Sequence, residues 1–278
     1  MRLNFVKISP AQNMTVLITD YVDPARYLEI ARVVMSYEYL NAEQVGFIVP
    51  PKTNQSRLGL EMSGGEFCGN AVLCAAAFGL YKGICQEGSF MVESSGAKAP
   101  LLCQAKAKSR NVFEIKAEMP QPFNMEELEI DIEGRSIFGW MVQLSGISHF
   151  VTNFWPSREN FEQMVESLQG KVDARALGII PYRKLGEGKY EIWPYVCVRD
   201  TGSRVFEQAC GTGSLSLGAH LHALQGECTL QVLQPGGIIT VETGAKNFIT
   251  TDVFFTCEGS VIIEENEGSQ GNNINMQK

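Results

Sequence analysis

The sequence has no long apolar run. Its longest apolar segments, residues 71–80 and 253–255, are much shorter than the ~20 residues that a membrane-spanning helix needs. The opening stretch MRLNFVKISP has no signal-peptide apolar core. We therefore expect a globular, cytoplasmic protein that does not have a membrane as its partner.

Basic residues are also in the minority. The chain has 23 Lys and Arg against 31 Asp and Glu, which gives a formal net charge of -8. Nucleic acids and anionic membranes are bound by clustered Lys and Arg, and the sequence has no basic stripe. We expect no nucleic-acid partner.

The eight cysteines include no CxxC pair, and Cys68 and Cys74 are too far apart for a zinc knuckle. Without a secretory signal, a reducing cytosol favours free thiols over disulfides. Of the three histidines, His220 and His222 lie two positions apart on a predicted helix and do not face the same side. We expect no metal site.

A chain of 278 residues that is 45% hydrophobic can bury a substantial core in one large domain or two of ordinary size. Alternating and β-branched segments predict that most of the first half is sheet, with strands at 3–8, 14–18, 44–49, 57–62, 90–93 and 112–118. A helix is expected at 24–35, with Asp23 as N-cap and Pro24 in the first helical position. Another is expected from Cys68 to about Tyr81.

The stretch Met119-Pro120-Gln121-Pro122 interrupts this pattern and indicates a domain boundary. Beyond it we expect strands at 128–132, 138–143, 192–198, 230–233 and 238–242, and helices at 157–168, capped by Ser157, and at 210–224. The predicted domains are residues 1–119 and 120–248. The polar end, residues 264–278, has few apolar residues and is expected to be disordered.

One pattern occurs once in each half, a lone cysteine before a glycine at the start of a predicted helix. The first copy reads Glu66-Phe67-Cys68-Gly69-Asn70-Ala71, and the second reads Glu207-Gln208-Ala209-Cys210-Gly211-Thr212-Gly213. The small residues permit close approach of another molecule. A helix N-terminus has unpaired N–H groups and a partial positive charge, so it can hold a carboxylate and lower the pKa of a cysteine.

These cysteines have two interpretations. A free cysteine beside glycine and alanine is often a small core residue, and we expect this of the remaining six, Cys74, Cys85, Cys103, Cys197, Cys228 and Cys257. The repetition of the pattern in two similar halves favours a function. Two facing cysteines could invert a stereocentre, because one removes a proton from one face while the other supplies a proton to the opposite face.

The two motifs resemble those of the diaminopimelate epimerase superfamily, whose members are cofactor-independent racemases and epimerases with two cysteines. Within it the chain is most similar to the histidine racemases of staphylopine-type metallophore biosynthesis. EQVGFI and EFCGNA together are fairly specific, whereas CGTG marks only the superfamily. The shared segments are Asn13-Met14-Thr15, Glu43-Gln44-Val45-Gly46-Phe47-Ile48, Met62-Ser63-Gly64, the two cysteine motifs and Gln234-Pro235-Gly236-Gly237.

The resemblance implies an α/β (α+β) fold of two pseudo-symmetric domains, each a curved mixed β-sheet around a central helix, with the site between them. It also implies that strands near 249–263 return to the N-terminal domain and that the protein is a homodimer without a cofactor. Cys68 and Cys210 would be the acid/base pair, with Glu43 as a further catalytic residue. Asn13 and Gln44 would line the cleft. The groups implied to hold the substrate carboxylate are Gly69, Asn70, Gly211 and Thr212.

The chain departs from the diaminopimelate epimerases in two places. Their GNPH turn is replaced by Gly146-Ile147-Ser148-His149, and their Glu-Arg pair is absent from Asp200-Thr201-Gly202-Ser203-Arg204. In that family these groups bind the distal end of the substrate, so a diaminopimelate substrate is not expected. Asp200 could instead bind a substrate amino or imidazole group, or be a solvated turn carboxylate. His149 could border the cleft or be structural.

The sequence therefore predicts an isomerase, an amino-acid racemase that converts L-histidine to D-histidine for metallophore synthesis. Two alternatives stay open. One is a diaminopimelate epimerase or a racemase of another polar amino acid. The other is a non-catalytic protein that binds an amino acid in the same cleft.

Overall fold

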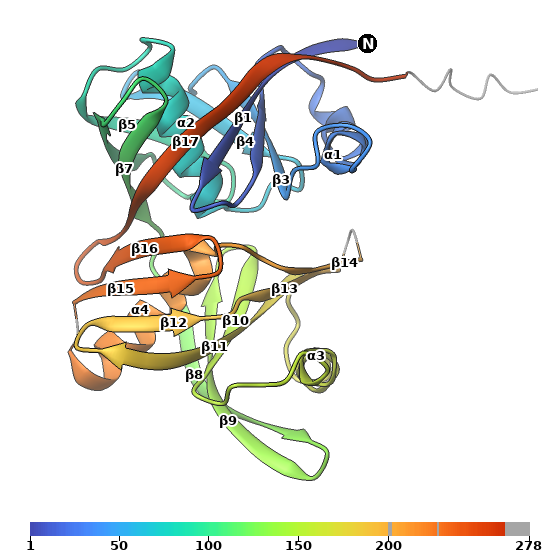
Figure 1. Ribbon diagram of the computed structural model, residues 1–278, viewed down its shortest axis with the longest axis vertical. Helices are drawn as coiled ribbons and strands as arrows, with labels where there is room; N and C mark the ends of the chain where they lie inside the picture. Colours follow the sequence, from blue (N-terminus) through green and yellow to red (C-terminus); the bar gives the residue numbers. More distant parts are fainter. Residues whose placement is uncertain (200–201, 227, 265–278) are drawn as a thin grey trace, which may run out of the picture.

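The computed structural model describes residues 1–199, 202–226 and 228–264. The chain forms two lobes, one above the other in Figure 1. Asp200 lies outside the described residues, and so does the predicted disordered tail apart from Glu264.

Strands of the upper lobe close into a barrel, because each strand pairs with the next in the order β1-β2-β3-β4-β5-β6-β7-β17 and β17 pairs again with β1. Most of these pairs are antiparallel, and β2–β3 and β4–β5 are parallel. The strands are β1 (Arg2–Pro10), β2 (Thr15–Ile18), β3 (Gln44–Val49), β4 (Ser56–Met62), β5 (Gly88–Ser94), β6 (Leu101–Ala107), β7 (Val112–Met119) and β17 (Asn247–Ile262).

The lower lobe is a curved mixed sheet organised around one long strand, β11 (Ala176–Gly186). The first half of β11 pairs with β10 and β13, and its second half pairs with β12, which leads through β15 to β16. The other strands are β8 (Asn124–Ile132), β9 (Arg135–Leu144), β10 (Ile147–Thr152), β12 (Lys189–Ile192), β13 (Tyr195–Val198), β14 (Ser203–Phe206), β15 (Thr229–Gln234) and β16 (Gly237–Glu242).

Strand β17 connects the lobes. Residues 248–250 pair with β16 of the lower lobe, and the strand then runs diagonally across the upper lobe along β1 (Figure 1). The predicted boundary near residue 120 falls between β7 and β8. The division into domains at 1–119 with 249–263 and at 120–248 stays a prediction.

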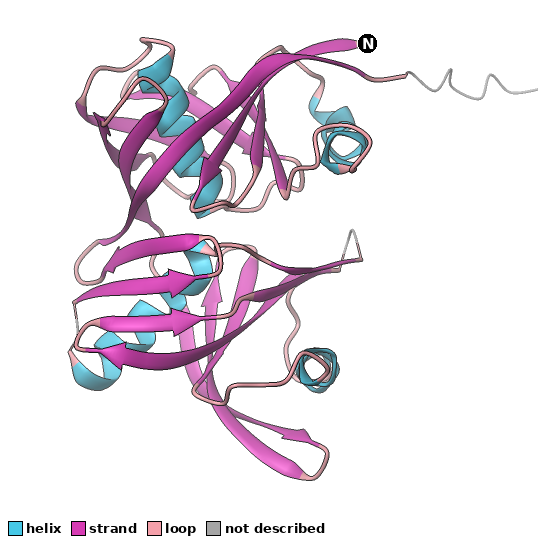
Figure 2. Cartoon of the chain, in the orientation of Figure 1, coloured by secondary structure: helices cyan, strands magenta, loops and turns pink. Residues whose placement is uncertain are grey.

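Each lobe surrounds a helix, α2 (Gly69–Tyr81) above and α4 (Gly211–Gln225) below, as Figure 2 shows. Residues 69–79 of α2 are all buried, so this helix has no polar face. Small residues let the strands pack closely against both helices. A Cβ on Gly79 would lie 2.6 Å from Cδ1 of Leu58, and one on Gly218 would lie 2.7 Å from Cγ1 of Val241.

The helix predicted at 24–35 is confirmed, although its first turn is a 3-10 turn. The chain makes a short 3-10 turn (Pro24–Arg26) and then α1 (Tyr27–Met35), and Asp23 Oδ1 accepts from the amide of Ala25 at 3.0 Å. The prediction that Ser157 caps the helix expected at 157–168 is wrong. Helix α3 (Asn160–Gln169) begins later, and the Ser157 hydroxyl donates to Asn160 Oδ1 at 3.0 Å instead.

The predicted strand 192–198 corresponds to β13 (Tyr195–Val198), and only its first residue, Ile192, belongs to β12. Pro194 separates β12 from β13, because proline has no N–H to continue the ladder. Strands β6, β10, β11 and β14 were not predicted from the pattern.

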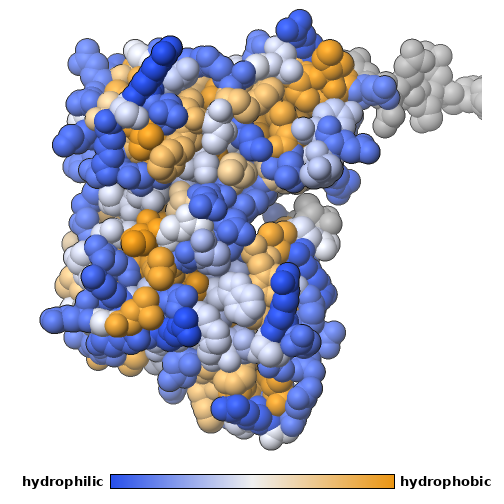
Figure 3. Space-filling model, viewed as in Figure 1, coloured by the Kyte–Doolittle hydropathy of each residue, from blue (hydrophilic) through white to orange (hydrophobic). Residues whose placement is uncertain are grey.

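The surface in Figure 3 carries separate hydrophobic patches bordered by hydrophilic residues, over both lobes. Within the described ranges, no helix is both long enough and apolar enough to cross a membrane.

Candidate active site

Cys68 and Cys210 occupy the same position at the start of α2 and of α4. Each is the N-cap residue with extended backbone, at φ -132° and ψ 110° for Cys68 and φ -122° and ψ 106° for Cys210. The amide of Ala71 donates to the Cys68 sulfur at 3.4 Å, and the amide of Gly213 donates to the Cys210 sulfur at 3.3 Å. The predicted location of both cysteines at a helix start is confirmed.

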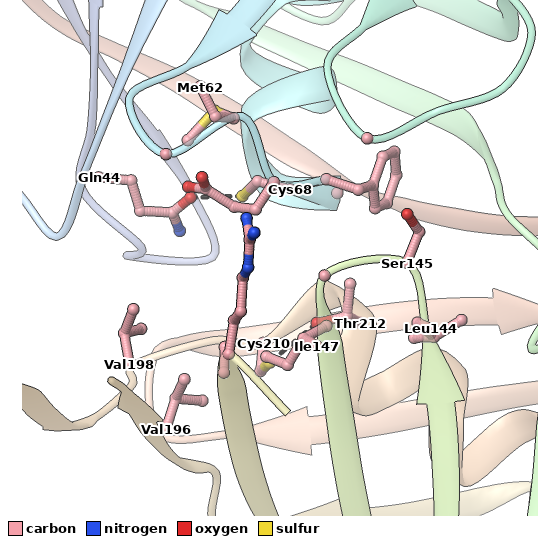
Figure 4. Close-up of a pocket in the computed structure, with 18 of the residues that line it drawn as sticks. Gln44, Met62, Cys68, Leu144, Ser145, Ile147, Val196, Val198, Cys210 and Thr212 are labelled. Atoms are coloured by element: carbon pink, nitrogen blue, oxygen red, sulfur yellow. Dashed lines mark hydrogen bonds between the residues drawn. The ribbon is translucent and has the colours of Figure 1, made fainter. Parts of the chain in front are cut away.

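A cavity of about 900 Å³ lies between the two helix starts. Cys68 lines it from the upper lobe and Cys210 from the lower lobe, together with Thr212 (Figure 4). The predicted site residues that line this cavity are Glu43, Gln44, Cys68, Gly69, Asn70, Cys210, Gly211 and Thr212. Asp200 lies outside the described residues.

Asn13 lies behind the cavity wall and is not among its lining residues. Its side chain is fully buried. It accepts from Nε2 of Gln44 at 2.6 Å and donates to Oε2 of Glu43 at 3.0 Å. The Gln44 oxygen in turn accepts from the thiol of Cys68 (Figure 4). Asn13 therefore orients the two polar side chains at the start of β3, and Gln44 orients Cys68.

Two asparagines join the lobes at the residue before Cys210. The carbonyl of Ala209 accepts from Nδ2 of Asn70 at 2.9 Å and from Nδ2 of Asn13 at 3.1 Å. All three residues are buried. The position of Cys210 is therefore fixed partly by upper-lobe side chains that sequence reasoning assigned only to the substrate.

Gln234 fixes the start of α4 from the other side. Its Oε1 accepts from the amide of Cys210 at 2.6 Å, and its Nε2 donates to Oγ of Ser214 at 2.9 Å. The segment QPGG was noted in the sequence only for its resemblance. No spacing in the sequence indicates this contact, because the two partners are joined only by the fold.

His149 is a structural residue behind Thr212. It is fully buried on β10, and its Nε2 lies 2.9 Å from Oγ1 of Thr212. Burial lowers the pKa of His149 to about 3, so the ring is neutral at ordinary pH. Of the two roles left open for His149, the geometry supports the structural one.

The thiol pKa values shift in the direction opposite to the expectation. Burial raises the pKa of Cys68 to about 12 and raises that of Cys210 well above its usual range, although the amides of Ala71 and Gly213 act to lower them. The prediction that the helix start lowers these pKa values is wrong in its net sign, because removal of a thiolate from water outweighs the local amide contacts.

Glu207 is a site residue that sequence reasoning missed. It lines the cavity, and its carboxyl interacts directly with the Cys210 thiol. Burial raises the pKa of Glu207 to about 7, and burial likewise raises that of Glu43 to about 7. The available signal was an acidic residue shortly before each cysteine, Glu66 in one motif and Glu207 in the other.

The charge of the cavity wall is mostly negative. The charged residues that line it are the carboxylates Glu43, Glu66, Asp173 and Glu207 and the guanidinium of Arg175. Asp173 is paired with Arg199 at 2.8 Å. Across the part of the chain that the structure describes, no group of three or more His, Cys, Asp or Glu residues is arranged to hold a metal ion.

The fold is shared with solved structures of a racemase and an epimerase. A probable proline racemase from Agrobacterium radiobacter superposes with a TM-score of 0.73 at 12% identity, covering 96% of this chain and 94% of that one. A hydroxyproline epimerase from Agrobacterium vitis superposes with a TM-score of 0.70 at 13% identity, covering 94% and 91% of the two chains. These similarities confirm the predicted epimerase-like α+β fold.

The sequence identifies the family. Residues 2–267 match the family described as "Histidine racemase CntK N-terminal domain", and the chain belongs to it. A histidine racemase of Fusobacterium nucleatum is 30% identical over 270 residues, 94% of this chain and 97% of that protein. One from Staphylococcus aureus is 25% identical over 275 residues, 94% and 98% of the two chains. The chain is therefore an isomerase, an amino-acid racemase.

Proposed function

We propose that this chain racemises histidine without a cofactor, with Cys68 and Cys210 as the acid/base pair. The cysteine that is a thiolate removes the Cα proton from one face, and the other cysteine, as a thiol, protonates the opposite face. Glu43 is proposed as a further catalytic residue. Gly69, Asn70, Gly211 and Thr212 would hold the substrate carboxylate near the two helix N-termini, where backbone N–H groups and the helix dipoles favour negative charge.

The observation that carries this proposal is the matched geometry of the two cysteines. Both sulfurs accept from an amide three residues later, and they line one cavity from opposite lobes. A cysteine that is only a core residue has no need of this repetition. The cavity of about 900 Å³ also has room for an amino acid.

The charge of the cavity favours histidine over diaminopimelate. Diaminopimelate would bring a second carboxylate together with a second ammonium. Carboxylates could hold the ammonium, but among the described residues only the guanidinium of Arg175 lines the cavity as a partner for the second carboxylate, against Glu43, Glu66, Asp173 and Glu207. An imidazole donates hydrogen bonds, and its positive form is attracted by carboxylates. The relatives described above are named histidine racemases, which also supports histidine as the substrate.

In heavy water, the purified protein should convert either enantiomer of histidine to the racemate, with deuterium at Cα of the product. Solvent deuterium enters because the proton that reaches the opposite face comes from a cysteine that exchanges with water. Chiral chromatography with mass spectrometry measures both quantities, and absence of pyridoxal phosphate absorbance checks the cofactor prediction. Diaminopimelate and other polar amino acids serve as the comparison panel.

The outcome separates the alternatives. Inversion of another amino acid at a higher rate than histidine would move the assignment to that substrate. Binding of histidine in calorimetry without inversion or exchange would favour the non-catalytic interpretation. A role in metallophore synthesis, a homodimeric state and a cytoplasmic location stay predictions.

A further inference from the structure

The two thiols have chemically different partners. The Cys68 thiol donates to the amide oxygen of Gln44, which can accept a hydrogen bond but cannot hold the proton at ordinary pH. The Cys210 thiol lies against the carboxyl of Glu207, which can take the proton. The site is therefore asymmetric, although the backbone geometry of the two cysteines is the same.

Glu207 is held in an enclosed position. Its backbone amide donates to the carbonyl of Pro194 at 3.1 Å, which places it just ahead of α4. Its Oε2 is buried and has no hydrogen-bond partner within the described ranges. A buried carboxylate oxygen without a partner is costly, whereas a protonated carboxyl is tolerated. Glu207 is thus suited to receiving a proton.

A second carboxyl, that of Glu43 from the other lobe, lines the same cavity as Glu207. The charge of Glu43 raises the pKa of Glu207, so the two carboxyls do not ionise independently. Among the described residues, the other titratable groups that interact with Glu207 are the thiols of Cys210 and Cys68. Glu43 itself is held by Nδ2 of Asn13. The Glu43 carboxylate therefore makes Glu207 a stronger proton acceptor, because a proton on Glu207 removes the repulsion of two buried negative charges.

This inference rests on the racemase chemistry proposed above. We propose that the Glu207 carboxylate is the proton acceptor of Cys210, and that the neighbouring Glu43 carboxylate makes Glu207 a stronger acceptor. The S–H bond of Cys210 breaks and an O–H bond forms on Glu207. The Cys210 thiolate then takes the Cα proton, and the Cys68 thiol protonates the opposite face. The proton on Glu207 finally returns through solvent to the Cys68 thiolate, which restores both thiols and the Glu207 carboxylate.

The test is Glu207→Gln, which keeps the shape of the side chain and removes the proton acceptor. Inversion of histidine should fall about 100-fold or more, within the range for loss of one acid/base group. The kcat/KM for inversion must fall equally in both directions, because the two enantiomers have equal free energy. Deuterium exchange without inversion can differ between the two enantiomers. Exchange of the enantiomer whose Cα proton faces Cys210 should fall at least tenfold more than exchange of the other.

The pH profile gives a second readout. In the unmodified protein, exchange at the Cys210 face should decline as pH falls through about 7, because protonated Glu207 cannot accept a proton. Glu207→Gln should lose this acid limb, and Glu207→Asp should keep it at a reduced rate. Glu43→Gln should move the limb to lower pH, because removal of the neighbouring charge lowers the pKa of Glu207. An unmoved limb would disprove the role of Glu43 in strengthening Glu207 as the acceptor.

Glu126→Gln on β8 is the matched control, since that carboxylate is exposed and lies outside the cavity. The proposal is overturned if Glu207→Gln reduces exchange of both enantiomers equally and leaves the acid limb of the unmodified protein in place. Where the amide variant does not fold, an equal reduction of exchange of both enantiomers in Glu207→Asp overturns it. Absence of any exchange in the unmodified protein is a different result. It would reject the racemase chemistry itself.

Discussion

Cys68→Ser and Cys210→Ser should each stop the inversion of histidine, with a loss of about 1,000-fold or more, because an acid/base group commonly contributes a factor of 100 to 10,000. A serine hydroxyl holds its proton far more tightly than a thiol. It therefore cannot become the base at ordinary pH, and it is a weaker acid for protonating the opposite face. The two cysteines line the cavity from opposite lobes, so we expect each to reach only one face of a bound α-carbon. The losses should therefore be similar for the two variants.

Deuterium exchange distinguishes the roles of the two cysteines. Each serine variant should still exchange the Cα proton of one enantiomer without inverting it, since the remaining cysteine can remove and return a proton on its own face. The two variants should exchange opposite enantiomers. Cys257→Ser is the control, because Cys257 is exposed and lies outside the cavity. Full inversion by either active-site variant would reject the two-cysteine mechanism.

The sequence predicted the parts of the site that depend on local structure. A cysteine followed by glycine and small residues forms a helix start in both halves, and the structure confirms helices from Gly69 and from Gly211. The alternation of apolar and polar residues also predicted many of the strands that surround these helices. Local hydrogen bonding and side-chain period determine these features, and both are visible in a short stretch of sequence.

The partners of the two cysteines could not be predicted in this way. Asn13 and Ala209 are 196 positions apart, yet their hydrogen bond helps to position Cys210. The predicted direction of the thiol pKa shifts was wrong for the same reason. The helix start is a local feature, but burial comes from the whole fold and is the larger effect. Glu207 was missed because only the folded structure shows that its carboxyl is buried beside a thiol.

Gly178→Ala should destabilise the protein by about 3 kcal/mol, at the upper end of the usual cost of overpacking a core. Gly178 on β11 pairs with His149 on β10, and an added Cβ would lie 2.1 Å from Nδ1 of the His149 ring. The ring is fully buried, so in a close-packed interior it can move only by displacing its neighbours. Its displacement would break the 2.9 Å contact with Thr212, at the start of α4.

Gly186→Ala provides a matched control, because it makes the same substitution in the same strand. A Cβ at Gly186 would meet nothing within 4 Å, so this variant should stay within ~0.5 kcal/mol of the unmodified protein. Denaturant unfolding measures both stabilities, and histidine racemisation measures the effect on Thr212. We expect Gly178→Ala to lose activity even where it is fully folded, since Thr212 lines the cavity beside Cys210. Equal stability of the two variants, with full activity in both, would show that His149 does not position Thr212 for the reaction.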